Sequence, residues 1–290
     1  MTLVNAPAGP TEGRRVGWID RRIEAAETGS GNRRWYGGLL AAVLAIGLWW
    51  LLAATGRFSP MLLPPPAQVV DAFRQSVAIH DNGQRGLLGS FLWTHFWASL
   101  RRVLLGLAWG IVLGIPLGLA LGLSRIGDRI LGPVVEFLRA LPPLGYFPLL
   151  ILWFGIGESS KVWLLSLASF APIAIATASG VAGVRMERVN AALVLGANRV
   201  QMVRHVVLPS VAGDIITGIR VATGFAWTTI VAAETANGLP GLGGLAWASQ
   251  KQLRADIAIL AIIVIGVTAV ASDALLRLLE RRIAPWKGRA

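Results

Sequence analysis

The sequence predicts an all-α fold, a polytopic membrane helical bundle with about six transmembrane helices. Of its 290 residues, 14% are charged and 54% are hydrophobic, whereas a soluble domain carries about a quarter charged residues. The mean hydropathy is +0.62, and the apolar residues gather in runs close to the roughly 20 residues that a helix needs to cross a bilayer. These runs are continuous, which argues against the alternating strands of a membrane barrel.

Six apolar runs follow a polar beginning. Residues 1–37 are rich in Gly, Pro, Arg and Glu and predict a mobile cytoplasmic tail, in which WIDRRIEAAE is a candidate short helix. The rest of the chain, 38–290, is expected to be the membrane domain. Its predicted crossings lie near 38–56, 103–123, 129–153, 162–182, 213–235 and 256–278.

The segment between the first two crossings, 57–102, is only partly apolar. Its stretch MLLPPPAQVVDAF predicts a rigid Pro-rich lead into an amphipathic helix. Its stretch GSFLWTHFWASLRR carries the aromatic residues typical of a segment at the membrane interface.

Basic residues predict which side of the membrane each loop faces. With the amino terminus inside and six crossings, 17 Lys and Arg fall on the cytoplasmic side and 6 on the outer side. Cytoplasmic loops carry this excess in membrane proteins, so both termini are expected in the cytoplasm. The net charge of +12 is therefore assigned to topology and lipid headgroups, not to nucleic acid.

Two crossings carry marked backbone features. The second has Gly every fourth residue from Gly106 to Gly122, which predicts close helix packing, with a sliding surface as the alternative. In the third, Pro142 and Pro143 are expected to break or kink the helix. A broken helix inside a membrane is either a structural kink or part of a watery path.

The segment NAALVLGANRVQMVRHVVLP, residues 190–209, predicts two short helices on the cytoplasmic side. The first runs to Gly196, which permits a bend, and the second places Val200, Val203 and Val207 on one face. Pro209 is expected to stop the second helix before the next crossing. The pattern allows an interfacial loop helix or a docking element that fits a partner's groove.

This segment resembles the cytoplasmic EAA loop of the permease subunits of ATP-binding cassette importers. The matching residues are Ala191, Ala192, Gly196, Ala197, Leu208 and Pro209. Asn190 stands where that family usually has Glu, which removes any inference of a salt bridge there but keeps the helix–Gly–helix shape.

The resemblance extends from about residue 60 to 288 and is closest to the nitrate, sulfonate, taurine and bicarbonate permeases. Among the similar segments are LPPPAQVVDAF, SLRRVLLGLAWGIVLGIPLGLALG, LRALPPLGYFPLLILWFGIGESSKV and ITGIRVATGFAWTTIVAAE. It implies the MetI-like permease fold in a bacterial inner membrane, with a coupling loop at about 183–212 that includes Arg199.

The resemblance also implies partners and a transported solute. The partners are a second permease copy, two ATPase subunits that bind the ATP, an extracytoplasmic solute-binding protein and membrane lipids. The solute is a small oxyanion such as an alkanesulfonate, taurine or nitrate; the alternatives are a heterocycle like a thiamine precursor, or a secondary transporter. The chain has no G-x-x-x-x-G-K-[ST] phosphate loop, so it is not expected to be an ATPase. No Ser-His-Asp or paired-carboxylate arrangement stands out either, so we expect no other enzyme activity, and no cofactor or metal of its own.

Charged side chains inside a membrane are costly and by default suggest function. The hypothesis for an anionic solute is that a set of residues flanks the translocation path: Arg101, Arg102, Arg139, Pro142, Pro143, Arg220, Trp227 and Glu234. The alternative for each Arg is pairing with a carboxylate or extension toward the headgroups. Glu136 and Arg139 are expected to pair across one helical turn.

Overall fold

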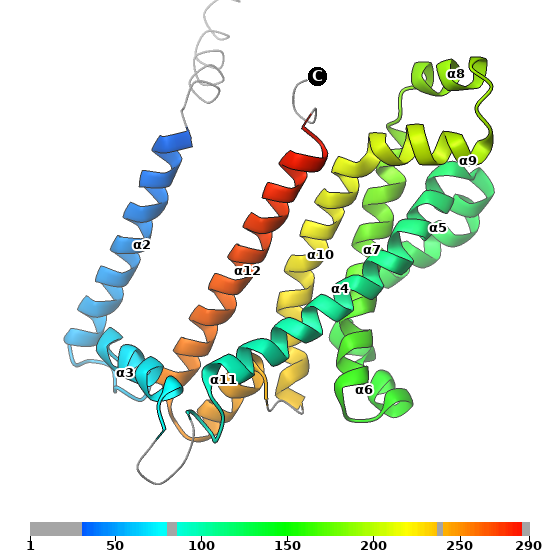
Figure 1. Ribbon diagram of the computed structural model, residues 1–290. Coiled ribbons are helices and arrows are strands. Elements are labelled where there is room, and N and C mark those ends of the chain that lie inside the picture. Colours follow the sequence, from blue (N-terminus) through cyan, green and yellow to red (C-terminus); the bar gives the residue numbers. More distant parts are fainter. Residues whose placement is uncertain (1–30, 80–85, 237–239, 286–290) are drawn as a thin grey trace, which may run out of the picture. The chain divides into compact units, whose positions relative to one another are not determined.

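The computed structural model describes residues 31–79, 86–236 and 240–285, and every regular element within these ranges is a helix (Figure 1). The chain divides into two compact units, Met1–Pro66 and Ala67–Ala290. Most of the predicted tail, with its candidate helix WIDRRIEAAE, lies outside the described residues.

The first unit contains α2 (Gly31–Ala54), a helix of 24 residues. It begins seven residues before the predicted start at 38, because nothing in GNRRWYG after the first Gly stops a helix. Its apolar part, Tyr36–Ala54, is long and apolar enough to cross a membrane. The Trp49 indole N–H donates to the carbonyl of Pro64 at 3.1 Å, which ties the Pro-rich segment back to this helix.

The second unit holds the remaining elements. In chain order these are α3 (Pro66–Val77), α4 (Leu92–Leu123), α5 (Arg125–Ala140), α6 (Pro143–Phe154), α7 (Glu158–Ala182), α8 (Met186–Val194), α9 (Arg199–Met202), the π-helical turn η1 (Val203–Val207), α10 (Leu208–Ala236), α11 (Leu242–Lys251) and α12 (Ala255–Ile283). The amphipathic helix predicted after the Pro-rich stretch is α3. In this unit α4, α7, α12 and the continuous helix Arg199–Ala236 are long and apolar enough to cross a membrane.

Helix α4 begins at Leu92, eleven residues before the predicted start of the second crossing. The aromatic segment assigned to the membrane interface is therefore the first part of this helix. The reason is tertiary, because its polar residues His95, Ser99 and Arg102 are buried and have polar partners on other elements. Polar groups that are paired in this way can occupy the interior of a long helix.

The glycine ridge of α4 packs against α7, as its four-residue spacing predicts. A Cβ atom added at Gly110 would lie 2.7 Å from Cβ of Ser169, and one at Gly118 would lie 2.5 Å from the carbonyl oxygen of Ala174. No side chain fits in such a gap, so glycine permits the two backbones to touch. The prediction of close packing is confirmed.

The predicted third crossing is two helices. Helix α5 ends at Ala140 and α6 begins at Pro143, with Leu141 and Pro142 in extended conformation between them. Proline lacks a backbone donor and disfavours helix in the residue before it, so the predicted break is confirmed.

Pro209 does not stop the helix that precedes it, which corrects the prediction. Helix α9 runs through η1 into α10 as one span, Arg199–Ala236. In η1 the N–H of Leu208 donates to the carbonyl of Val203, five residues back. A π-helical turn changes the register of the helix, which accommodates a proline directly after it.

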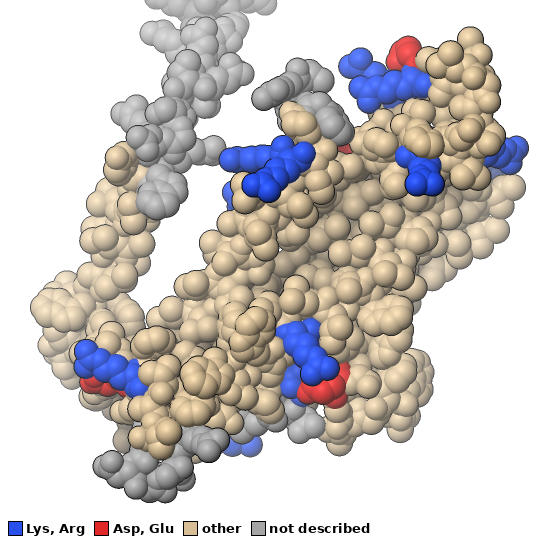
Figure 2. Space-filling view, viewed as in Figure 1, with Lys and Arg blue, Asp and Glu red and all other residues tan. Residues whose placement is uncertain are grey.

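The basic loops of the second unit gather at one end. The α4–α5 junction, α8, α9 and the last turns of α12 lie at the end that carries α8, whereas α6 and α11 lie at the opposite end (Figure 1). Over this unit, Figure 2 shows a wide band without charged side chains between Lys and Arg at the α8 end and charges near the other end. This separation is the one expected of a membrane-spanning bundle.

Candidate functional site

The loop between α7 and α10 has the predicted helix–Gly–helix shape. Helix α8 ends at Val194, and Gly196 follows with a φ of +79°, a left-handed conformation that glycine adopts without strain. Helix α9 is then fixed by a capping box. The Asn198 side chain accepts from the N–H of Gln201, and the Gln201 side chain accepts from the N–H of Asn198, each at 2.9 Å.

The tip of this loop is apolar and exposed. Val194 and Leu195 are each 87% exposed, and Val200 is 74% exposed. The structure places the residues predicted for the coupling loop as follows: Asn190, Ala191 and Ala192 on α8, Gly196 and Ala197 in the turn, Arg199 at the start of α9, and Leu208 and Pro209 at the start of α10. Exposed apolar groups on a polar loop are typical of a surface that docks against a partner.

Beyond this loop, two hollows lie along α7. One of about 390 Å³ lies between α5, α7 and α10, and Arg139, Pro172, Thr217 and Phe225 contribute to its lining. A second of about 510 Å³ lies between α4, α5 and α7. Both are bordered by Ile175 of α7, so they are neighbours on one helix.

Arg139 lines the first of these hollows and also pairs within its own helix. Its Nη2 lies 2.9 Å from Oε2 of Glu136, which confirms the pair predicted across one turn. Pro142 and Pro143 form the break that follows. Trp227 is 3% exposed and packs in the core between α4, α7 and α10.

Arg220 joins α10 to α12. Its guanidinium lies 2.9 Å from Asp273 and 3.0 Å from Glu280, and Asp273 also pairs with Arg277. Thr217 donates to Glu280 at 3.1 Å. This cluster fixes the last half of α12 against α10 near the α8 end.

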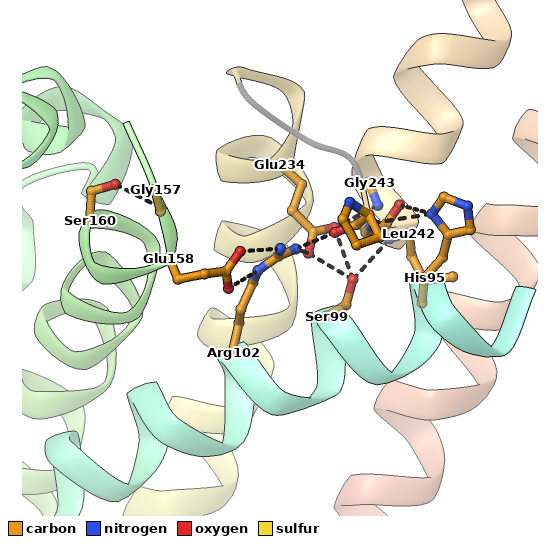
Figure 3. A network of polar contacts seen from close by, with 11 residues as sticks. His95, Ser99, Arg102, Gly157, Glu158, Ser160, Glu234, Leu242 and Gly243 are labelled. Carbon is orange, nitrogen blue, oxygen red and sulfur yellow. Dashed lines mark hydrogen bonds and ion pairs between the residues drawn. The ribbon is translucent and has the colours of Figure 1, made fainter. Parts of the chain in front are cut away.

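Arg102 is the centre of a buried polar network at the opposite end (Figure 3). Its side chain is 3% exposed, and it reaches carboxylates on two other helices. Nε lies 2.7 Å from Glu158 at the start of α7, and Nη1 lies 2.7 Å from Glu234 near the end of α10. Nη1 also donates to the carbonyl of Pro240 at 2.8 Å.

Glu234 ties the turn after α10 to α4. Its carboxylate is fully buried and accepts from the hydroxyl of Ser99 at 2.7 Å and from the N–H of Gly243 at 2.8 Å. The Ser99 hydroxyl in turn accepts from the N–H of Leu242, and His95 Nδ1 lies 3.1 Å from the carbonyl of Gly241. Figure 3 shows these groups pointing into the space between α4 and the α10–α11 turn.

Sequence reasoning missed most of this network. It named Arg102 and Glu234, but not Glu158, His95 or Ser99. The sequence does contain a signal for this network. His95, Ser99 and Arg102 are spaced four and three residues apart and so share a helix face. Arg101, the neighbour of Arg102, is exposed.

The fold and these two regions define a class: a multi-pass membrane protein with an exposed helical loop at one end and a buried polar network between helices at the other. The family model "Binding-protein-dependent transport system inner membrane component" matches residues 110–285. The chain belongs to this family of importer permeases, as its sequence resemblance predicted.

Named relatives and solved structures agree with this assignment. The chain is 41% identical to the Escherichia coli taurine transport system permease protein TauC, covering 87% of this chain and 89% of that one. It is 37% identical to the putative aliphatic sulfonates transport permease protein SsuC of Escherichia coli, covering 83% and 88%. In fold it is similar to a chain of the inward-facing MetNI methionine ABC transporter, with a TM-score of 0.52 at 21% identity over 64% of this chain and 96% of that one.

Proposed function

We infer that this permease carries a small sulfonate such as taurine across the bacterial inner membrane, driven by ATP that its partner subunits bind. The support is the 41% identity to a taurine permease along 87% of the chain, together with the likeness to an aliphatic sulfonate permease. A solute-binding protein delivers the sulfonate from outside, and two copies of the permease enclose the path.

The loop from α8 to α9 is the part that docks on the ATPase. Its apolar tip, Val194 and Leu195, is almost fully exposed, and burying such side chains in a partner's groove contributes about 1.5 kcal/mol or more each. The capping box and the continuous helix from Arg199 to Ala236 connect this tip rigidly to a membrane span. A displacement of the tip therefore moves α10 as well.

The path runs along the hollows beside α7, where Arg139 lies at the lining. An anion would meet this guanidinium beside the break at Pro142 and Pro143. Arg220 lies on α10 within the cluster that holds α12, and Arg102 holds the outer turns together. Their role in transport is to keep these helices in position, whereas Arg101 is exposed and lies near the outer mouth.

The docking proposal is tested by charging the tip. The Val194→Asp, Leu195→Asp double variant should lose co-purification of the ATPase subunit and ATP-dependent taurine uptake, because carboxylates do not enter an apolar groove. Ile126→Asp is the matched control, since Ile126 on α5 is 71% exposed and lies outside the loop. ATPase capture and uptake by the double variant at the control's level would overturn the docking role.

The solute is tested by competition in the same uptake assay. Unlabelled taurine and ethanesulfonate should compete with labelled taurine, and a flavin should not. The chain is also 32% identical to a riboflavin transport system permease. Competition by riboflavin alone would therefore show that the transported solute is a heterocycle and not a sulfonate.

A further inference from the structure

The turn between α11 and α12 holds a leucine in a backbone conformation that usually belongs to glycine. Leu253 has a φ of +56°, in the left-handed region that residues with a Cβ atom adopt only at a cost. The N–H of Leu253 donates to the carbonyl of Gln250 at 3.1 Å, and the N–H of Arg254 donates to the carbonyl of Ser249 at 3.0 Å. This pair of bonds is the Schellman ending of a helix, in which glycine is the common residue at the left-handed position.

The side chain of Leu253 is 66% exposed, so it packs little against its own chain. In a Schellman ending, the residue after the left-handed position often makes an apolar contact with the last turn of the helix, but here those positions hold Arg254 and Ser249. The three residues before Leu253, 250–252, are polar and exposed as well. An exposed leucine is ordinary by itself, whereas one kept at a backbone cost among polar neighbours indicates a function.

The base of this turn is fixed on both sides. Arg254, directly after the leucine, places Nε 2.9 Å and Nη2 2.7 Å from the carboxylate of Asp256 in the first turn of α12. At the other end of α11, the first backbone N–H groups donate to Ser99 and Glu234. Leu253 is therefore presented on an ordered support, and such a side chain loses little freedom when a partner covers it.

The place of the turn in the molecule indicates which partner covers it. Helix α11 lies at the end of the second unit opposite α8 (Figure 1), away from the loop proposed to dock on the ATPase. Transport in this family depends on a binding protein, which delivers the solute from the other side of the membrane. Both the partner and the orientation come from the proposed function.

We propose that the α11–α12 turn, residues 250–254, docks on the solute-binding protein, with Leu253 as its apolar anchor. The exposed Lys251 lies beside the anchor and adds a cation, so the matching surface has an apolar depression with a carboxylate at its rim. Apolar anchors at the centre of an interface carry much of its affinity, and charges at the rim mainly steer the encounter.

The experiment uses the full permease with its ATPase partner in nanodiscs, and surface plasmon resonance measures binding of the purified solute-binding protein. Leu253→Gly should weaken this binding about tenfold, because the apolar anchor is lost. The midpoint of thermal unfolding should stay the same or rise by about 2 °C, since glycine adopts this φ without strain. A residue that served only the fold would not lower the affinity while the stability is kept.

Leu88→Gly is the matched control, because Leu88 is the other described leucine with a positive φ, at +52°, and is only partly exposed. It should bind like the parent. Lys251→Glu should slow association, more at low salt than at high salt, and unchanged association would remove this cation from the surface.

Equal affinities of Leu253→Gly and Leu88→Gly would overturn the proposal and leave the leucine to the membrane surface or to a second copy of the chain. The binding protein is added with taurine and without it. A wrong solute changes the affinity of the parent on adding taurine, whereas a wrong surface changes the ranking of the variants, so the two failures are told apart.

Discussion

At the scale of single residues, Arg102 shows how a charge is retained deep in an apolar bundle. Burying an ion costs several kcal/mol unless its partners are close and well placed. Glu158, Glu234 and the carbonyl of Pro240 meet this guanidinium at hydrogen-bonding distance from three parts of the chain. The N–H donors of Arg102 are thus directed at groups of the protein itself. Its role is therefore structural, and few of its donors remain to contact a solute.

The two carboxylates of this network should differ sharply in their effect on stability. Glu234→Gln leaves the buried Arg102 without its fully buried counter-charge and should lower the free energy of unfolding by on the order of 3 kcal/mol. Glu158→Gln should cost about 1 kcal/mol or less, because the Glu158 side chain is 65% exposed. Thermal unfolding of the purified permease measures both, and equal losses would contradict this view of the network.

At the scale of elements, the sequence predicted what depends on local chemistry. Among the described residues, five of the six apolar runs correspond to helices long enough to cross a membrane, whereas the third run is divided into the shorter helices α5 and α6. The four-residue glycine spacing predicted the α4–α7 contact, and Pro142 and Pro143 predicted the break between α5 and α6. The helix–Gly–helix shape of the loop between α7 and α10 was predicted from its residues and from its likeness to known permeases.

What the sequence did not predict depends on tertiary partners. The early start of α4 requires that Ser99 and Arg102 find partners on α7, α10 and the following turn. The helix through Pro209 requires the π-helical turn, which no residue pattern in VRHVV announces. Glu158 lies 56 residues from Arg102, so their pairing follows from the α4–α7 packing and not from spacing.

The glycine ridge gives a test at this scale. Gly118→Ala should destabilise the permease by about 1–3 kcal/mol, since the added methyl would overlap α7 and force the helices apart. Gly266→Ala, in α12, is the matched control because nothing lies within 4 Å of the added Cβ, and it should be neutral or stabilise by up to about 1 kcal/mol. The midpoint of thermal unfolding compares the two, and equal shifts would show that the ridge is not a close contact.

At the scale of the whole molecule, the connections between successive long helices of the second unit lie at one end of the unit and then at the other. The α4–α5 junction, the α7–α10 loop and the end of α12 share one end, and the turns around α6 and α11 share the other (Figure 1). The basic excess belongs to the first end, where Arg125, Arg185, Arg188 and Arg199 lie. By the charge rule we expect this end to face the cytoplasm, and the proposed docking loop would then lie on the side where ATP is available.

The orientation of the second unit in the membrane can be tested by labelling introduced cysteines. Because the chain contains no cysteine of its own, it gives no background labelling. Arg125→Cys and Lys251→Cys each replace one exposed cation, and they lie at opposite ends of the second unit. In intact cells with a permeable outer membrane, a charged maleimide that cannot cross the inner membrane should label Lys251→Cys and not Arg125→Cys. Inside-out vesicles should reverse the pattern, since the exposed surface is then the cytoplasmic one. Labelling of Arg125→Cys from outside would place α8 on the outer face, where no cytoplasmic ATPase could reach its apolar tip.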